Sequence, residues 1–262
     1  MRGIKLPFTA SHAAAAAPFA RFGFNLSALV IGSFSPDFIY FILLAPLGHS
    51  THTIQGVFLF CVPAGLGVLW VYHSLLKAPL TALLPDPLGK ALLDPNPQLR
   101  VLSIRRLPVL AASVALGAFT HLLWDGFTHE SGWALTLLPF LKVNVMDLGF
   151  EQVPFTRVLH HASSLIGLAW IALKAKDCLN GCGCGKREIL RSATTFFAIL
   201  SGAAVLGILY VWIQGQPITG FDELRRSTIQ ALIASGTFLS AILAGYGILW
   251  RIMKARAEVE KV

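Results

Sequence analysis

One segment of the chain, GAFTHLLWDGFTH, carries polar groups at a spacing that suits metal binding or proton transfer. His121 and Asp125 are four residues apart, so a helix would place both side chains on one face, about one turn apart. His129 continues this face with an angular drift of roughly 80° over two turns. An imidazole and a carboxylate so placed can ligate one divalent ion, or they can pair with each other without a metal. Both interpretations stay open from this segment alone.

Three groups of the same chemistry lie nearer the N-terminus: His12 in FTASHAAAAAP, Asp37 in SPDFIYF and His52 in GHSTHTIQG. Pro36 precedes Asp37, and proline kinks or breaks an apolar helix, which would turn the carboxylate toward a cavity. His12 reaches the depth of Asp37 if residues 9–22 form a short helix folded back against the next apolar segment. Imidazole and carboxylate ligands suit zinc, and also manganese or iron. We therefore predict one metal site, formed by His12, Asp37, His52, His121 and Asp125.

The other histidines are weaker candidates. His160 and His161 are adjacent, so on a helix they point about 100° apart and at most one would reach the site. We predict that His161, with Ser164 nearby, is the one that does so. His49 is an alternative to His52. His73 is expected near lipid headgroups at the opposite end of its segment.

Composition indicates which elements must position these residues. Of 262 residues, 55% are hydrophobic and 13% charged, and the mean hydropathy is +0.67. A soluble domain carries about 25% charged residues, so a water-soluble globule is excluded. A membrane-spanning helix needs about 20 mainly apolar residues. We predict an all-α, polytopic transmembrane bundle of one domain over residues 1–262, with a short N-terminal helix and about six spans: 26–47, 55–76, 108–128, 158–173, 192–213 and 228–250.

The charged residues predict how this bundle is oriented. In a bundle of six spans, both termini and every second loop lie on one side, and these segments, 1–25, 77–107, 174–191 and 251–262, hold 17 of the 21 Lys and Arg residues. The loops on the other side, 48–54, 129–157 and 214–227, hold the remaining four. Basic residues concentrate in the cytoplasm, so we predict that both termini are cytoplasmic, with 77–107 as a cytoplasmic connector and 174–191 as a basic loop rich in cysteine and glycine. Because the bases are spread over four segments, the net charge of +8 needs no nucleic-acid partner.

Two acidic residues stand apart from this pattern. Of the 13 Asp and Glu residues, only Asp37 and Asp125 fall within the predicted spans. An ionisable group at membrane depth costs a few kcal/mol on insertion scales, so each marks a functional-site hypothesis. The alternative is a neutral carboxyl group that packs and hydrogen-bonds.

The cysteines do not predict a disulfide framework. Cys61 lies in the second span, whereas Cys178, Cys182 and Cys184 sit together in CLNGCGCGKR on the predicted cytoplasmic side. We expect free thiols in a flexible loop. A soft-metal site is the alternative, although a closed zinc site needs four ligands.

The motifs FTASHAAAAAP, IGSFSPDFIYF, HSTHTIQG, GAFTHLLWDGFTH and HHASSLIGL together resemble a family of bacterial membrane proteins known as domain of unknown function 4184, over about residues 6–250. That family is similar to bacterial membrane-bound metal-dependent hydrolases, whose N-terminal histidine, Pro-Asp motif, histidine-pair element and His-x-x-x-Asp helix correspond here to His12, Asp37, His49 through His52, and His121 with Asp125. The order of these groups is also similar to that of zinc-dependent phospholipase C, an all-helical phosphodiesterase with three zinc ions. The chain lacks that enzyme's final His-x-x-x-Glu, since Ser164 and Leu165 stand four residues after His160 and His161. The resemblance therefore implies hydrolysis of a phosphoester, with one or two ions rather than three.

The combined hypothesis is a metal-dependent hydrolase of the bacterial inner (plasma) membrane, acting on a phosphoester or lipid-type substrate near the outer face. A spare carboxylate, such as Asp37, or His129 would act as general base or acid. Two alternatives stay open. One is a structural or partner-binding membrane protein whose polar residues join helices. The other is a proton or metal-ion transporter, which predicts ionisable groups through the whole depth of the bilayer.

Overall fold

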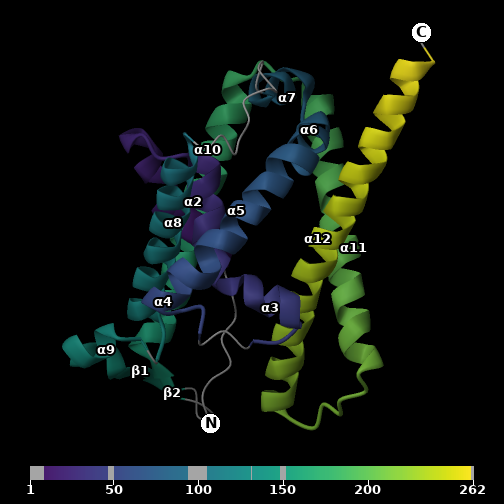
Figure 1. The fold of residues 1–262 in the computed structure, drawn as a ribbon. Helices are drawn as coiled ribbons and strands as arrows, with labels where there is room; N and C mark the ends of the chain where they lie inside the picture. The colour runs from purple at the N-terminus through teal and green to yellow at the C-terminus, as the bar shows by residue number, and fades with distance from the viewer. Residues whose placement is uncertain (1–8, 47–49, 94–104, 131, 148–151, 261–262) are drawn as a thin grey trace.

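The computed structural model describes residues 9–46, 50–93, 105–130, 132–147 and 152–260. It is a bundle of α-helices with one small antiparallel hairpin, so the all-α fold class is confirmed (Figure 1). Within the described residues, six helical segments are long and apolar enough to cross a membrane: Leu26–Leu43, Ile54–Ala82, Leu107–Thr128, Phe155–Gly181, Lys186–Ile213 and Phe221–Val259. Each of the six spans predicted from the sequence overlaps one of these segments.

The N-terminal helix folds back as predicted. It comprises α1 (Thr9–Ala16) and the 3-10 helix η1 (Ala17–Phe22), and it packs against α2 (Leu26–Phe34). Gly23 makes the reversal possible because its φ of 91° lies in the left-handed region that glycine adopts without strain. Asn25 then caps α2 by accepting a hydrogen bond from the backbone nitrogen of Ala28 at 2.9 Å.

Proline breaks the first span where the sequence predicts it. The α-helix ends at Phe34, a 3-10 turn η2 (Ser35–Asp37) follows, and α3 (Phe38–Leu43) completes the span. Pro36 lacks a backbone N–H and its ring clashes with the preceding turn, so a regular α-helix cannot continue through it. The break leaves Asp37 buried inside the protein.

The second span is divided into short α-helical pieces and two π-helical turns. In order these are α4 (Ile54–Gly56), η3 (Val57–Cys61), α5 (Val62–Val71), η4 (Tyr72–Leu76) and α6 (Lys77–Ala82). The short helix α7 (Asp86–Leu92) follows, and α8 (Leu107–Thr128) forms the third span.

Helices α2 and α8 cross at close range. Gly32 and Gly117 face the partner helix there, and a Cβ atom on either would overlap backbone atoms across the crossing. Ala28, Leu69, Leu110 and Val114 form the adjoining core. Glycine on both helices thus lets the backbones approach, which brings the Pro36 break next to the last turns of α8.

A compact segment connects α8 to the fourth span. It holds α9 (Ala134–Leu137), the 3-10 turn η5 (Pro139–Lys142) and a hairpin of β1 (Asn144–Asp147) with β2 (Gln152–Pro154), in which Asp147 pairs with Gln152. The fourth span, α10 (Phe155–Gly181), starts directly after β2. The sequence predicted only a loop here, because a hairpin this short leaves little alternation in hydrophobicity.

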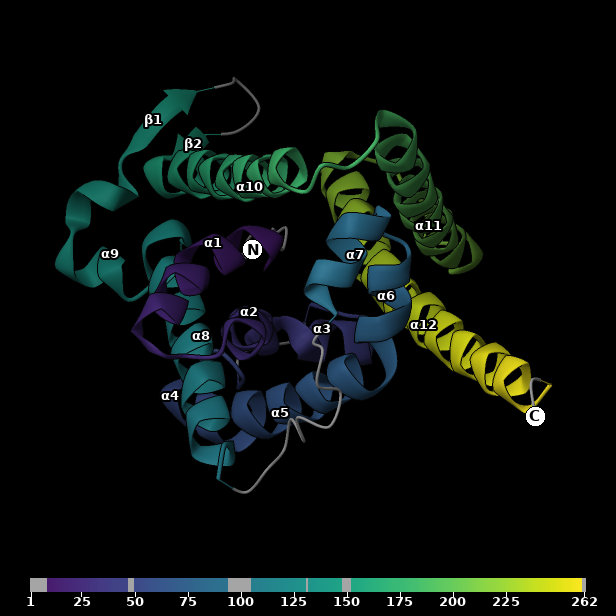
Figure 2. The ribbon, with the colours of Figure 1, turned by 90° about the horizontal axis from the view of Figure 1, so that it is seen from above.

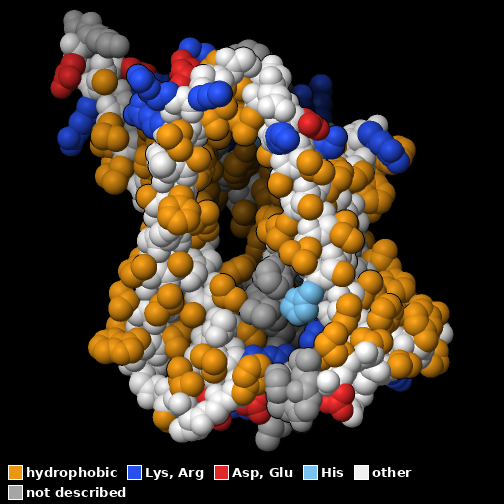
Figure 3. Space-filling view, turned by 180° about the vertical axis from the view of Figure 1, so that it is seen from behind, with side chains coloured by type: hydrophobic (Ala, Val, Ile, Leu, Met, Phe, Trp, Pro, Cys, Tyr) orange, Lys and Arg blue, Asp and Glu red, His pale blue; other side chains and the backbone are white. Residues whose placement is uncertain are grey.

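The last two helices, α11 (Lys186–Ile213) and α12 (Phe221–Val259), form a hairpin on the opposite side of the bundle from α9 (Figure 2). The predicted loop 174–191 is shorter in the structure, since α10 continues to Gly181 and α11 begins at Lys186. Charged residues end the hydrophobic run there but are compatible with a helix. Hydrophobic side chains cover the middle of the face seen in Figure 3, and many Lys and Arg residues gather at its upper end.

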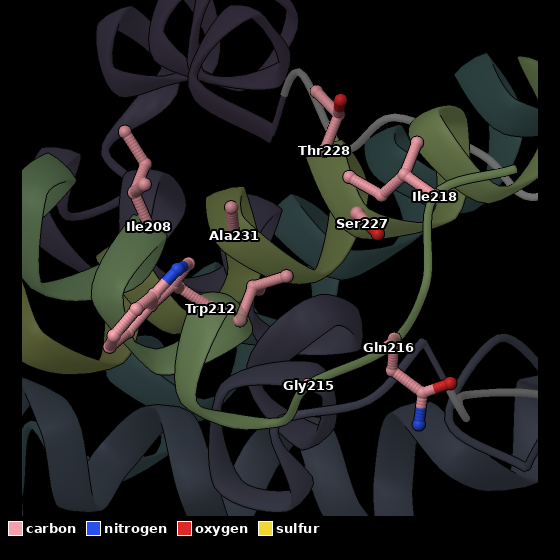
Figure 4. Close-up of a pocket in the computed structure, with 9 residues that line it drawn as sticks. Ile208, Trp212, Gly215, Gln216, Ile218, Ser227, Thr228 and Ala231 are labelled. Carbon is pink, nitrogen blue, oxygen red and sulfur yellow. The ribbon is translucent and has the colours of Figure 1, made fainter.

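A cavity of about 460 Å³ lies at the turn between α11 and α12 (Figure 4). Its described lining includes Trp212, Gln216 and Thr228, and it contains no His, Cys, Asp or Glu side chain. The described lining therefore offers no side chain of the kinds that bind metals or transfer protons.

Candidate metal centre

Four separate segments bring the five predicted ligands into one cluster. His12 comes from α1, Asp37 from η2 and His52 from the turn before α4, whereas His121 and Asp125 lie one turn apart on α8. The His12, Asp37 and His121 residues are buried, with exposed fractions of 4%, 4% and 1%. The structure thus brings these five side chains together.

Asp125 lies in the middle of the cluster. Its Oδ2 is 3.4 Å from Nε2 of His121, 3.8 Å from Nε2 of His52 and 3.6 Å from Nε2 of His129. Its Oδ1 is 3.7 Å from Nε2 of His12. One carboxylate thus faces four imidazoles.

Asp37 adds a second carboxylate on another side. Its Oδ1 lies 3.3 Å from Nε2 of His52 and 3.8 Å from Nε2 of His121. Its Oδ2 accepts a hydrogen bond from the hydroxyl of Thr9, the first residue of α1. Thr9 therefore fixes the carboxylate so that one oxygen faces the histidines.

These groups form two overlapping sets, each with three ligand atoms that lie within 4.8 Å of one another. The first set is His12, His121 and Asp125, and the second is Asp37, His52 and His121. His121 belongs to both. Three nitrogen or oxygen ligands with room for water are the usual protein contribution to a catalytic zinc site.

Backbone carbonyl groups orient the imidazoles, directly or through a threonine. Nδ1 of His121 donates to the carbonyl oxygen of Ser33 at 2.7 Å, so its Nε2 carries the lone pair that faces the carboxylates. The Thr51 hydroxyl donates to the carbonyl oxygen of Pro36 at 2.8 Å and thus accepts from Nδ1 of His52, at 3.2 Å. Both His52 and His121 therefore carry their ring proton on Nδ1, and Nε2 is the atom that can bind a metal ion.

A matching relay lies beside His129. The Thr128 hydroxyl donates to the carbonyl oxygen of Trp124 at 3.0 Å and accepts from Nδ1 of His129 at 3.2 Å. Metal-binding histidines in proteins are commonly held by such contacts to their second nitrogen. His129 shares this orientation although it lies just beyond the end of α8.

Three buried polar atoms in the cluster have a hydrogen-bonding capacity that a cation could satisfy. Nε2 of His121, Oδ1 of Asp125 and Nδ1 of His12 have no hydrogen-bond partner among the residues that the structure describes. Buried polar atoms in proteins nearly always have a partner. A divalent cation would satisfy both the imidazole nitrogen and the carboxylate oxygen, so the residues present fit a metal ion.

His12 has the protonation state that a ligand requires. Its ring stacks on that of His121, with centroids 4.0 Å apart. Burial, followed by the nearby His121, lowers the pKa of His12 to about 3. The imidazole is therefore neutral at physiological pH and can bind a metal ion.

The structure places His160, rather than His161, toward the cluster. His160 is buried, with its ring centroid 5.1 Å from that of His129, whereas His161 is exposed. The preference for His161 as an added ligand is thus not supported. The sequence showed that the two point apart, but the choice between them depends on how α10 packs against α1. Ser164, one turn after His160, is buried on the same side.

Two other predicted positions lie outside the cluster. His73 is in η4, within the segment Ile54–Ala82, where its ring contacts Tyr72. His49 lies outside the described residues.

Sequence reasoning missed several residues that support the site. Tyr40 stacks on His52 with ring centroids 5.8 Å apart, and the ring of Trp124 contacts that of His12 at 5.4 Å. Thr9 and Thr51 hold an oxygen and a nitrogen of the cluster. Threonine and aromatic residues are common in membrane helices, so their type does not mark them as part of a site. Only the short distance in sequence from Tyr40 to Asp37 and from Thr51 to His52 could have indicated a role.

Two of the three clustered cysteines, Cys182 and Cys184, lie with their Sγ atoms in contact at the turn between α10 and α11, whereas Cys178 is an exposed free thiol. Cys61 is buried, and its Sγ lies 3.7 Å from the carbonyl oxygen of Thr51.

Comparison with known families gives one match. The family described as a domain of unknown function, DUF4184, matches residues 6–250. The match covers most of the 262 residues, so the chain belongs to this family, as its motifs indicated. No curated protein and no solved structure matches the chain.

Proposed function

We propose that this member of the DUF4184 family is a membrane-embedded, metal-dependent hydrolase. The observation that carries the proposal is the buried pair of overlapping ligand sets that share His121. An empty cluster would leave two carboxylates and several imidazoles in an apolar bundle with unsatisfied polar atoms, which is costly. A bound cation offsets that cost.

Zinc is the ion we propose, with manganese or iron as alternatives. Neutral imidazoles together with carboxylates suit zinc best among common ions, and the described cluster contains no thiolate ligand. Nε2 of His121 can bind one ion at a time, so the two sets compete for a single ion unless a second ion binds through Asp125 and the neighbouring histidines. One or two ions are consistent with this arrangement.

A bound divalent ion would supply a water of lowered pKa and would polarise the scissile group. The residues that do not bind the ion then have acid–base roles. His129 has an exposed side-chain fraction of 10% and lies 3.6 Å from Asp125, so it can move a proton at the edge of the site. Asp37 can act as base when His12, His121 and Asp125 hold the ion.

The proposed substrate is a phosphoester or a lipid-type molecule, reached from the outer face of the bacterial inner membrane. The order of histidines and aspartates, which is similar to that of phospholipase C, supports the phosphoester, and the apolar bundle around the site supports a lipid. The orientation, with both termini cytoplasmic, is proposed from the distribution of Lys and Arg.

The two rival functions make different demands. A transporter needs ionisable groups through the bilayer depth, yet away from the cluster and the helix ends the described spans add only His73, near Lys77. A purely structural role for the cluster predicts that its residues contribute to folding but that the protein binds no ion.

Metal content of the purified protein tests the proposal. We expect near-stoichiometric zinc, manganese or iron in the wild type and in His161→Ala, the matched exposed control. His121→Ala and Asp125→Asn should lose the ion while they remain monodisperse in detergent. A wild type that holds no metal after reconstitution with each ion refutes the proposal.

Activity is the second part of the test. The loaded protein should hydrolyse soluble phosphodiesters or phospholipids in vesicles, and the two depleted variants should not. Tightly bound metal without hydrolysis of either class would contradict the enzymatic role and indicate a structural metal.

A further inference from the structure

The segment between α8 and α10 has a core of its own. We call it the side flap, comprising α9, η5, β1 and β2. Ala134, Leu135 and Leu141 are buried there against Phe127, Phe155 and Leu159, which belong to the ends of α8 and α10. The backbone nitrogen of Phe155 also donates to the carbonyl oxygen of Val143 at 2.9 Å. The side flap is therefore fixed to two spans.

The exposed surface of the side flap is largely apolar. Five large hydrophobic side chains there are about half exposed or more, with fractions of 69% for Leu137, 57% for Phe140, 56% for Val143, 51% for Val145 and 53% for Met146. Its described residues include only two charges, Lys142 and Asp147. A two-stranded hairpin is marginally stable by itself, and one that is apolar outward calls for a covering surface.

The place of the side flap favours lipid as that cover. It joins the ends of two spans, so it lies at the level where a bilayer's hydrocarbon gives way to headgroups. Figure 1 shows α9, β1 and β2 at the lower end of the bundle, and Figure 2 shows them at its edge, outside α8 and α10. In that position the side flap borders the lipids that surround the helices.

The apolar surface is also continuous with the lipid-facing helices. Leu123 on α8 and Leu165 and Ile166 on α10 are exposed by 53%, 68% and 70%. Trp133, 49% exposed, joins the side flap to α8 by packing on Gly126 and Phe127. Tryptophan is enriched at the membrane interface, where one side of the ring is apolar and the other wet.

We propose that the side flap is an interfacial membrane-binding element, which inserts its apolar face into the leaflet at the end of the bundle that holds the His/Asp cluster. Phe140 and Val145 enter the boundary between headgroups and acyl chains, and the Lys142 ammonium remains among lipid phosphates. Sequence reasoning treated residues 129–157 as an ordinary outer loop. The inference does not depend on metal binding, because it rests on a surface distinct from the cluster.

Fluorescence quenching in vesicles tests this placement. The full chain, with Cys178, Cys182 and Cys184 replaced by serine and the buried Cys61 retained, receives one exposed cysteine by Phe140→Cys or Val145→Cys. That exposed cysteine is labelled with an environment-sensitive dye. Asp222→Cys, exposed in the first turn of α12, is the matched reference. Each protein is reconstituted in phosphatidylcholine–phosphatidylglycerol vesicles with a lipid that carries a nitroxide at acyl carbon 5, or is exposed to aqueous iodide.

We expect the lipid nitroxide to quench the labels at 140 and 145 about threefold more strongly than the label at 222, since an interfacial element lies roughly 5–10 Å into this zone. Iodide should show the reverse order. Iodide quenching at 140 and 145 equal to that at 222 would overturn the proposal. Protection of both labels from both quenchers would overturn it too, because a protein or a second copy of the chain would then cover the face.

Discussion

A glycine that touches no ligand should control metal affinity. Gly117 lies on α8 one turn before His121, where this helix crosses α2. A Cβ atom at Gly117 would overlap the carbonyl oxygen of Leu29 and lie 2.7 Å from the backbone nitrogen of Ser33. Both are backbone atoms, so no change of rotamer can relieve the overlap. The substitution Gly117→Ala therefore forces the two helices apart.

The size of the effect follows from the contact distances. Ordinary Cβ contacts begin at about 3.4 Å, so α2 and α8 must separate by at least about 0.7 Å near Ser33. The hydrogen bond from His121 Nδ1 to the Ser33 carbonyl, now 2.7 Å, would stretch toward its limit. Metal–ligand distances tolerate only about 0.2 Å, and the loss of such orienting contacts typically costs 10–100-fold in metal affinity. We expect a 10–100-fold loss, with a destabilisation of about 1–3 kcal/mol from overpacking.

Competition with a fluorescent chelator in detergent gives the affinity of the wild type and of Gly117→Ala. Gly67→Ala is the matched control, because Gly67 also lies within a spanning helix but a Cβ there meets nothing within 4 Å. Gly67→Ala should bind metal as the wild type does. Wild-type affinity in a folded Gly117→Ala protein would refute the argument that the glycine crossing sets the distance between the ligands on α8 and Asp37, which follows α2.

Three further effects follow from the site. Thr9→Val removes the hydroxyl that holds Asp37 Oδ2, so titration calorimetry should show about tenfold weaker metal binding. His160→Ala removes the ring packed against His129 and should lower hydrolysis about tenfold, whereas His161→Ala should stay within about twofold, as measured in initial-rate assays. Removal of the ion with a chelator should lower the thermal midpoint by about 5–10 °C, because a ligand at 100 times its Kd stabilises the native state by about 2.7 kcal/mol.

Each of these effects has an opposite result that would contradict its reasoning. Unchanged affinity in Thr9→Val would mean that Asp37 is not held by α1. A larger loss in His161→Ala than in His160→Ala would reverse the assignment of the buried face of α10. A thermal midpoint that does not respond to the chelator would indicate that the cluster holds no stabilising ion.

The sequence predicts the parts of the fold that depend on local chemistry. Long apolar runs identify the six spans, and Pro36 identifies the break that buries Asp37, because proline acts on its own turn. The spacing of His121 and Asp125 fixes their shared face for the same reason. His12 joins the cluster because a short helix with a turn at Gly23 can only fold back along the next span.

The remaining features depend on how helices pack, which a single sequence does not reveal. His160 and His161 differ in burial only because α10 presents one face to α1, where Gly167 packs on Ser11. The contact between His121 and Ser33 requires the glycine crossing of α2 and α8. The side flap went unpredicted because its hydrophobic residues are too few and too irregular to suggest a strand pair.

X-ray absorption spectroscopy of the metal-loaded protein tests the central claim most directly, since it reports the ligand atoms of the bound ion. A His/Asp centre predicts a first shell of nitrogen and oxygen only, at about 2.0–2.2 Å for zinc, with imidazole scattering that is lost in His121→Ala. Sulfur scattering at about 2.3 Å would contradict the account, because it would place the ion on cysteine thiolates instead of the buried cluster.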